Sequence, residues 1–192
     1  MTAQAHQGGQ LDQWIQAYEA ARDRAGELVG GLSHEQINFR PAPKAWSVAQ
    51  CLDHLAVSIR VYLDPLEPIV ERARAAGRSG GEPYGRGPFM GRFLIRSLKK
   101  PGKRYPAPKS FRPRGGELDA EAVRAELAGE LRRLQNAAEQ CKGLALGEIR
   151  MPWPAFRPVK LSLAQAFELQ AIHLHRHLDQ AERVTRAPGF PA

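Results

Sequence analysis

The chain has 192 residues, 43% of them hydrophobic, and a formal net charge of +8, which predicts a single domain, residues 1–192, with one sizeable core. No apolar run approaches the roughly 20 residues of a membrane-spanning helix, and the polar first ten residues do not resemble a secretory signal peptide. We therefore expect a cytoplasmic protein with no membrane partner, and the two widely separated cysteines make no disulfide framework that would suggest otherwise.

Helical periodicity dominates the chain, whereas runs of β-branched residues with period two are almost absent, so we expect an all-α fold. Four helices are predicted, at about residues 11–29, 48–70, 119–142 and 162–186. The first has apolar residues on one face and should end at Gly30 and Gly31. That face consists of Leu11, Trp14, Ile15, Tyr18, Ala25, Leu28 and Val29.

The second predicted helix begins after Ser47. Ser47 and Gln50 have the spacing of a capping box, in which each side chain bonds to the backbone of the other residue. Pro65 and Pro68 predict that this helix kinks or ends near Asp64, because proline lacks an N–H and clashes with the preceding turn.

Residues 71–116 form a basic segment that is rich in helix breakers. They include nine glycines and six prolines, too many for a long helix. Thirteen Lys or Arg and two acidic residues give this segment a formal charge of +11, against −3 for the remainder. We expect a long irregular connection between helices two and three, a basic insertion that holds one short amphipathic helix from Pro88 to Lys99.

The third and fourth helices have clear beginnings. Asp119 can cap the third, whose apolar stripe runs to Cys141. After a second stretch expected to be irregular, around Pro152 and Pro158, Ser162 and Gln165 form another capping-box pair. The fourth helix should therefore begin after Ser162.

Two histidines interrupt the apolar face of the fourth helix. His173 and His177 are four residues apart, so their Cβ atoms should lie about 5–6 Å from each other on one side of the helix. Two imidazoles so placed can bind one ion at the roughly 2.0–2.1 Å of a Zn–N bond. His175 lies about 200° around the helix from His173 and is expected to face solvent.

A third histidine, His54, lies at the edge of the apolar face of helix two. Helix bundles commonly build metal sites from facing helices, so we expect His54, His173 and His177 to bind one divalent metal ion. Three histidines leave at least one coordination position open, as in catalytic zinc sites. The alternative is that they are hydrogen-bonded packing residues, because an isolated HxxxH pair is not specific for metal.

Other polar residues near these histidines are candidates for supporting roles. Gln170, one turn before His173, and Ser58, one turn after His54, can form hydrogen bonds to the ligands or to a substrate. The alternative for each is an ordinary polar residue at a helix edge. No catalytic residue beyond the metal ligands is predicted, since Cys51 and Cys141 fall on inward faces and should be buried and inert.

Two groups of residues follow a recognisable order. The first is Arg40-Pro41, then Trp46-Ser47-Val48, then His54; the second is the run HLHRHLDQ from His173 to Gln180, preceded by LSLAQ from Leu161. They resemble the RP…WS…H and HxxRHxxQ segments of the DinB-like (DinB/YfiT) superfamily of metal-binding four-helix bundles. The likeness spans about residues 10–184.

This resemblance implies an up-down-down-up bundle, a metal site at His54, His173 and His177, and frequent assembly as a homodimer. Members with known activity include thiol-dependent S-transferases and isomerases, which hold a low-molecular-weight thiol such as bacillithiol or mycothiol on the metal. The basic insertion is longer than a minimal member needs, so a particular substrate is not carried over.

Three hypotheses about function follow. The first is a metal-dependent S-transferase or hydrolase, in which a zinc or nickel ion activates a small thiol or a water against an electrophilic substrate. The second is a non-catalytic bundle that the metal only stabilises. The third is a nucleic-acid binding module in which aromatic residues interleave with Arg and Lys of the insertion. These aromatic residues are Phe89, Phe93, Tyr105 and Phe111.

Overall fold

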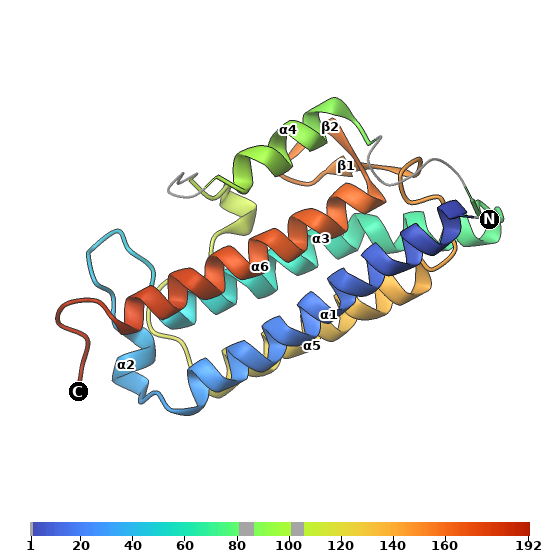
Figure 1. Cartoon of the computed structure of the whole chain (residues 1–192). Helices are drawn as coiled ribbons and strands as arrows, with labels where there is room; N and C mark the ends of the chain where they lie inside the picture. Colours follow the sequence, from blue (N-terminus) through green and yellow to red (C-terminus); the bar gives the residue numbers. More distant parts are fainter. Residues whose placement is uncertain (1, 81–86, 101–105) are drawn as a thin grey trace.

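The computed structural model describes residues 2–80, 87–100 and 106–192. Its four long helices are α1 (Thr2–Gly30), α3 (Val48–Ala75), α5 (Ala120–Gln140) and α6 (Leu163–Thr185). The shorter elements are α2 (His34–Asn38), α4 (Phe89–Leu98), the 3-10 helix η1 (Lys109–Phe111) and the strands β1 (Arg150–Trp153) and β2 (Phe156–Ser162). The long helices form the bundle, and α4 lies outside it with the two strands (Figure 1).

The bundle has the expected up-down-down-up order. α1 and α3 each pack against both α5 and α6, and Figure 1 shows α1 and α6 running opposite to α3 and α5. Asn38, which ends α2, exchanges hydrogen bonds of 2.8 and 3.0 Å with the backbone of Leu118, just before α5. Because α3 and α5 run in the same direction, the chain must return along the bundle between them, which explains the long crossover.

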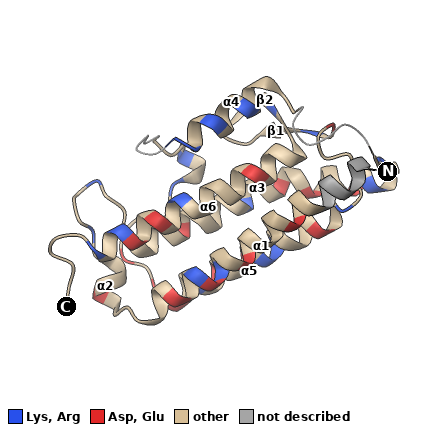
Figure 2. Cartoon of the chain, in the orientation of Figure 1, with Lys and Arg blue, Asp and Glu red and all other residues tan. Residues whose placement is uncertain are grey.

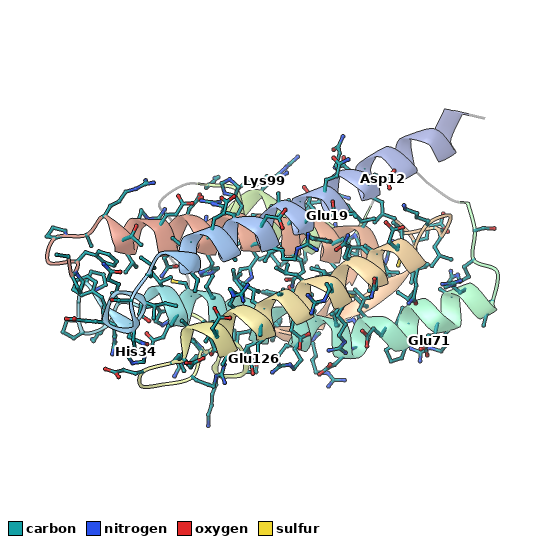
Figure 3. The ribbon with its side chains drawn as sticks, turned by 90° about the horizontal axis from the view of Figure 1, so that it is seen from below. Asp12, Glu19, His34, Glu71, Lys99 and Glu126 are labelled. Carbon is teal, nitrogen blue, oxygen red and sulfur yellow. The ribbon has the colours of Figure 1, made fainter. Side chains whose placement is uncertain are left out.

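The core lies between the four long helices. The apolar stripe of α5 is buried as predicted, from Val123 to Cys141. Tyr18 of α1 is buried and donates a 2.8 Å hydrogen bond to the carbonyl oxygen of Phe167, so it joins α1 to α6. Gln135 of α5 donates to the carboxylate of Glu19, which lies where α1 meets α5 (Figure 3).

Both predicted capping boxes are present, and each does more than begin a helix. Ser47 and Gln50 cap α3, and Ser162 and Gln165 cap α6. The side-chain amide of Gln50 also donates to the carbonyl of Arg114, and that of Gln165 donates to the carbonyl of Pro88. The crossover is therefore anchored at the beginnings of the two helices that carry the histidines.

Helix two does not end near Asp64, which was one of the two outcomes expected from its prolines, and it runs five residues beyond the predicted end at residue 70. α3 continues through Pro65 and Pro68 to Ala75. Proline in a helix loses one hydrogen bond and crowds the preceding turn. Leu66 and Val70 beyond the first proline are each 1% exposed, and their burial in the core offsets this cost.

The stretch before α6 is not irregular. β1 and β2 form an antiparallel hairpin in which Met151 pairs with Leu161, and both side chains are fully buried. The prolines of this stretch obscured the short strand pattern. The expected helical bundle is confirmed, and the one small hairpin replaces only the stretch that was expected to be irregular. The short helix α2, with its own capping box at Ser33, and the extension of α1 back to Thr2 were also missed.

The short helix expected at the centre of the insertion is confirmed as α4. Its Gly91 lies so close to the side chain of Gln165 that an added Cβ atom would overlap it. Glycine at this position lets α4 approach the beginning of α6. Across the described residues, no helix is both long and apolar enough to cross a membrane.

Candidate metal centre

The three predicted histidines meet between α3 and α6. One ring nitrogen from each of His54, His173 and His177 lies within 4.8 Å of the other two. The Nε2 atoms of His54 and His173 are 3.0 Å apart. The ring centroid of His177 lies 4.4 Å from that of His54 and 4.5 Å from that of His173. Helices that are far apart in sequence therefore bring three imidazoles into one cluster.

The orientation of His54 is fixed by the crossover. Its Nδ1–H donates a 2.5 Å hydrogen bond to the carbonyl oxygen of Phe111, which can only accept. His54 must then carry its proton on Nδ1, so in the neutral ring Nε2 presents a lone pair to the cluster. A backbone carbonyl that orients a histidine in this way is typical of metal ligands.

Ser58 serves the same purpose for His173. The hydroxyl of Ser58, which is 1% exposed, lies 3.3 Å from Nδ1 of His173. A hydroxyl can donate or accept, so it satisfies either tautomer of this ring. When Nδ1–H of His173 donates to Ser58, Nε2 faces the cluster with a lone pair, as Nε2 of His54 does.

His177 has an unsatisfied nitrogen. Its Nδ1 is buried and has no hydrogen-bond partner among the described residues. Burial, and next the neighbouring His54, lower the pKa of His177 to about 3, although the nearby side chain of Gln180 opposes the shift. Burial likewise lowers the pKa of His54 and lowers that of His173 well below its usual value. All three rings are therefore neutral at pH 7, which is the state that binds a metal.

Trp46 forms one wall of the cluster, a role that the sequence did not reveal. Its ring centroid lies 4.7 Å from that of His54 and 5.8 Å from that of His177. Arg40 shapes the loop before it, because its guanidinium donates to the carbonyl oxygens of Pro43 and Ala45. The signal available was position: Trp46 directly precedes the cap of the helix that carries His54.

An ion pair next to the cluster holds the crossover in place. The carboxylate of Asp53, which is 1% exposed, accepts 2.7 Å hydrogen bonds from both the backbone N–H and Nε of Arg114. Glu126 binds the outer side of the same guanidinium. This contact fixes the segment that supplies the carbonyl of Phe111 to His54. Asp53 and Arg114 were not predicted, since nothing in the sequence links residues so far apart.

The remaining predicted residues fall as follows. Gln170 is 2% exposed, and its Oε1 has no partner among the described residues. His175 is exposed, as expected, and pairs with Asp179. Cys51 and Cys141 are buried, and burial raises the pKa of each thiol to about 12, so neither is a thiolate at neutral pH.

The donor set fits a divalent transition metal. A tetrahedral zinc ion held by two imidazoles at roughly 2.0–2.1 Å separates their nitrogens by about 3.3 Å, close to the 3.0 Å between His54 and His173. The unpartnered nitrogen of His177 is also accounted for if a cation, rather than a hydrogen-bond donor, is its partner. Three neutral nitrogen donors suit zinc, nickel and related ions.

Comparison with known proteins decides the family. Residues 17–181 match the sequence profile described as the DinB superfamily. The chain belongs to the DinB superfamily. No curated protein matches it.

A solved structure agrees with this DinB superfamily assignment at the level of the fold. YfiT from Bacillus subtilis, described as a probable metal-dependent hydrolase with an unusual four-helix bundle topology, is 18% identical and superposes with a TM-score of 0.56. The match covers 94% of this DinB superfamily chain and 89% of YfiT. It supports the up-down-down-up arrangement that positions the histidine cluster.

Proposed function

We propose that the chain is a metal-dependent enzyme whose cluster of His54, His173 and His177 holds one zinc or nickel ion. The observation that carries this proposal is the convergence of three neutral imidazoles from two helices, two of them oriented by hydrogen bonds at the far nitrogen. Packing histidines need no such convergence, because each would be satisfied by its own partner. The description of YfiT as a probable metal-dependent hydrolase gives independent support.

We propose further that the reaction is thiol-dependent S-transfer or hydrolysis. Such an ion, when bound, would lower the pKa of a thiol or water that it holds, so that the nucleophilic thiolate or hydroxide is present at neutral pH. His54, His173 and His177 would hold the ion through three neutral nitrogens, and three protein ligands leave a coordination position for the nucleophile. In S-transfer, the sulfur forms a bond to the electrophilic carbon, and the leaving group departs with its electron pair.

The residues around the cluster determine access. His173 and His177 are each only half-buried, so a small thiol can reach the cluster from solvent and its proton can leave by the same route. Trp46 covers His54 and His177 on one side, which limits entry of water there. The side-chain carbonyl oxygen of Gln170, one turn from His173, bonds to none of the residues that the structure describes and is proposed to hold a polar group of the substrate.

The first test measures metal binding alone. Purified protein should contain close to one zinc or nickel per chain, or take up one on titration. His177→Ala should lose this metal, whereas His175→Ala, a change on the exposed side of the same helix, should retain it. Apoprotein that neither binds zinc or nickel nor gains thermal stability with them would refute the proposed site, since a native-state ligand must stabilise the fold.

The second test separates an enzyme from a bundle that the metal only stabilises. Metal-loaded protein is assayed with small thiols and monochlorobimane, and with activated esters in the absence of thiol. Turnover that His177→Ala abolishes and His175→Ala preserves supports catalysis, and the substrate that reacts distinguishes transferase from hydrolase. Full metal loading without turnover of either kind supports the structural role. Assembly as a homodimer stays a prediction, for sedimentation to test.

A further inference from the structure

The large apolar side chains that are exposed in the described ranges are all on α4 and the strand beside it. They are Phe89, Met90, Phe93 and Phe156, with exposed fractions of 70, 49, 60 and 57%. α4 packs against both α6 and β2, and it forms an outer layer of the molecule (Figure 1). Single apolar residues are ordinary on a protein surface, whereas a concentration of them marks an interaction site.

α4 is held firmly from within, so its outer apolar face is not needed for the core. Its inner face consists of Gly91 and Ile95, which are buried. The carbonyl of Pro88 at its beginning accepts from Gln165. At its other end, the carbonyl of Leu98 accepts a 2.8 Å hydrogen bond from Arg176 of α6. The outward aromatic side chains are thus displayed on a fixed support.

The charged residues of this face all have one sign. α4, β1 and β2 together contain five Arg or Lys and no Asp or Glu, and Figure 2 shows basic residues alone on α4. Arg96, Arg157 and Lys160 are exposed and form no ion pair with any residue in the described ranges. On the bundle itself, by contrast, Arg24 and Arg133 are paired with acids.

We propose that α4 and β2 dock on the surface of an anionic lipid bilayer. Phe89, Met90 and Phe93 would enter the headgroup region, while the basic side chains around them contact anionic headgroups. A short amphipathic helix with aromatic residues on one side and arginines at its border has the chemistry of such interfacial binding. We expected no membrane partner because no segment can span a bilayer, but surface binding needs no spanning segment.

Two other partners could bind this face, a second copy of the chain or a nucleic acid. The charges and the exposed side chains of the face favour a bilayer over both. A second copy docked by a two-fold axis would bring only positive side chains together, which is unfavourable. The nucleic-acid hypothesis relied on four aromatic rings of the insertion for stacking. Phe111 is buried, with its ring centroid 6.2 Å from that of Tyr62, so Phe89 and Phe93 are the rings of that set that the described residues expose. Tyr105 lies outside the described residues.

Flotation of the full-length protein with vesicles tests the proposal. Vesicles of phosphatidylglycerol mixed with phosphatidylcholine should carry the protein, and vesicles of phosphatidylcholine alone should carry much less. Phe89→Ser with Phe93→Ser should reduce binding on the order of tenfold. Arg96→Ser should weaken it about fivefold. Arg132→Ser, an exposed change on α5 away from α4, is the control and should bind as the native chain does.

Every outcome bears on the proposal. Circular dichroism melting of each variant verifies that these surface changes leave the fold intact. Failure of the native protein to float with the anionic vesicles overturns it, and so does equal flotation of the Phe89→Ser, Phe93→Ser variant. A third result would also overturn the proposal. The Phe89→Ser, Phe93→Ser variant or Arg96→Ser would abolish self-association or binding of a single-stranded oligonucleotide, while vesicle binding stayed unchanged.

Discussion

The buried carboxylate of Asp53 binds Arg114 at two points, the backbone N–H and the guanidinium, each at 2.7 Å. Asp53 directly precedes His54 in α3, and Arg114 lies three residues after Phe111 in the chain. The pair therefore connects the two ends of the contact in which the carbonyl of Phe111 receives Nδ1–H of His54. Asp53 therefore holds the backbone segment whose carbonyl orients the ring of His54.

Asp53→Asn should weaken metal binding. The amide keeps the size of the side chain but loses the charge that holds Arg114, so the carbonyl of Phe111 is positioned less well. Loss of such an outer contact typically lowers metal affinity about 10- to 100-fold. The measurement is a zinc titration against a competing chelator of known affinity.

A matched change on the same guanidinium serves as the control for Asp53→Asn. Glu126→Gln removes the solvent-exposed partner of Arg114, and an exposed ion pair contributes only about 0–1 kcal/mol. Zinc affinity should therefore stay within about twofold of the native value. If Glu126→Gln and Asp53→Asn weaken binding equally, the proposed positioning of Phe111 is wrong.

Stability of the metal-free protein should fall as the pH is lowered from 7 to 5. Burial holds the pKa of His177 at about 3 in the folded chain, against about 6.5 in the unfolded chain. Above pH 6.5 the ring is neutral in both states, so there is no effect. Between pH 6.5 and 3 only the unfolded chain takes up the proton, which favours unfolding. For His177 alone this amounts to about 2 kcal/mol at pH 5.

Urea unfolding at pH 7 and pH 5 measures this dependence. His177→Gln removes one of the titrating groups and should therefore reduce the difference in the free energy of unfolding between pH 7 and pH 5. His34→Gln, a change at an exposed histidine of α2, should keep the native dependence. A native protein that is equally stable at both pH values would contradict the burial of neutral histidines.

The sequence predicted those features that depend on local patterns. Capping boxes at Ser47 and Ser162 marked where the two histidine-bearing helices begin, because a cap depends on residues only three positions apart. The four-residue spacing of His173 and His177 placed both on one face for the same reason. The inward position of His54 followed from the apolar stripe of its helix.

Features that depend on tertiary contacts could not be predicted. The sequence left open whether Pro65 and Pro68 kink or end α3. The choice depends on the burial of Leu66 and Val70 against other helices, which overrides the local preference of proline to end a helix. The carbonyl of Phe111 that orients His54 is a backbone group. Every residue type has one, so the sequence does not indicate which carbonyl accepts the hydrogen bond. The hairpin before α6 depends on burial of paired residues, not on propensity.

Gln170→Leu should separate a core role from a substrate role. The Oε1 atom of Gln170 is buried and has no partner in the described part of the chain, and an unsatisfied polar group costs about 1–3 kcal/mol. Leucine has a similar size and no polar atom, so the free energy of unfolding should stay the same or rise. If Gln170 holds the substrate, kcat/KM should fall about tenfold or more while metal content is unchanged. Unchanged kcat/KM would assign Gln170 to packing.

The same substitution at two helical glycines should have opposite effects on stability. Gly129 of α5 has open space where a Cβ atom would be added, so Gly129→Ala should stabilise the protein by about 0.5–1 kcal/mol. At Gly91 of α4 the added atom overlaps the side chain of Gln165. Gln165 cannot move away freely, because its amide caps α6 at Ser162 and also donates to Pro88.

Gly91→Ala should therefore destabilise the protein, by about 1–2 kcal/mol for the hydrogen bonds that are lost. It should also loosen α4, so that trypsin cleaves faster after Arg92 and Arg96 while zinc affinity stays native. Gly129→Ala should leave the cleavage rate unchanged. If Gly91→Ala stabilises the protein as much as Gly129→Ala does, then α4 does not pack on the beginning of α6.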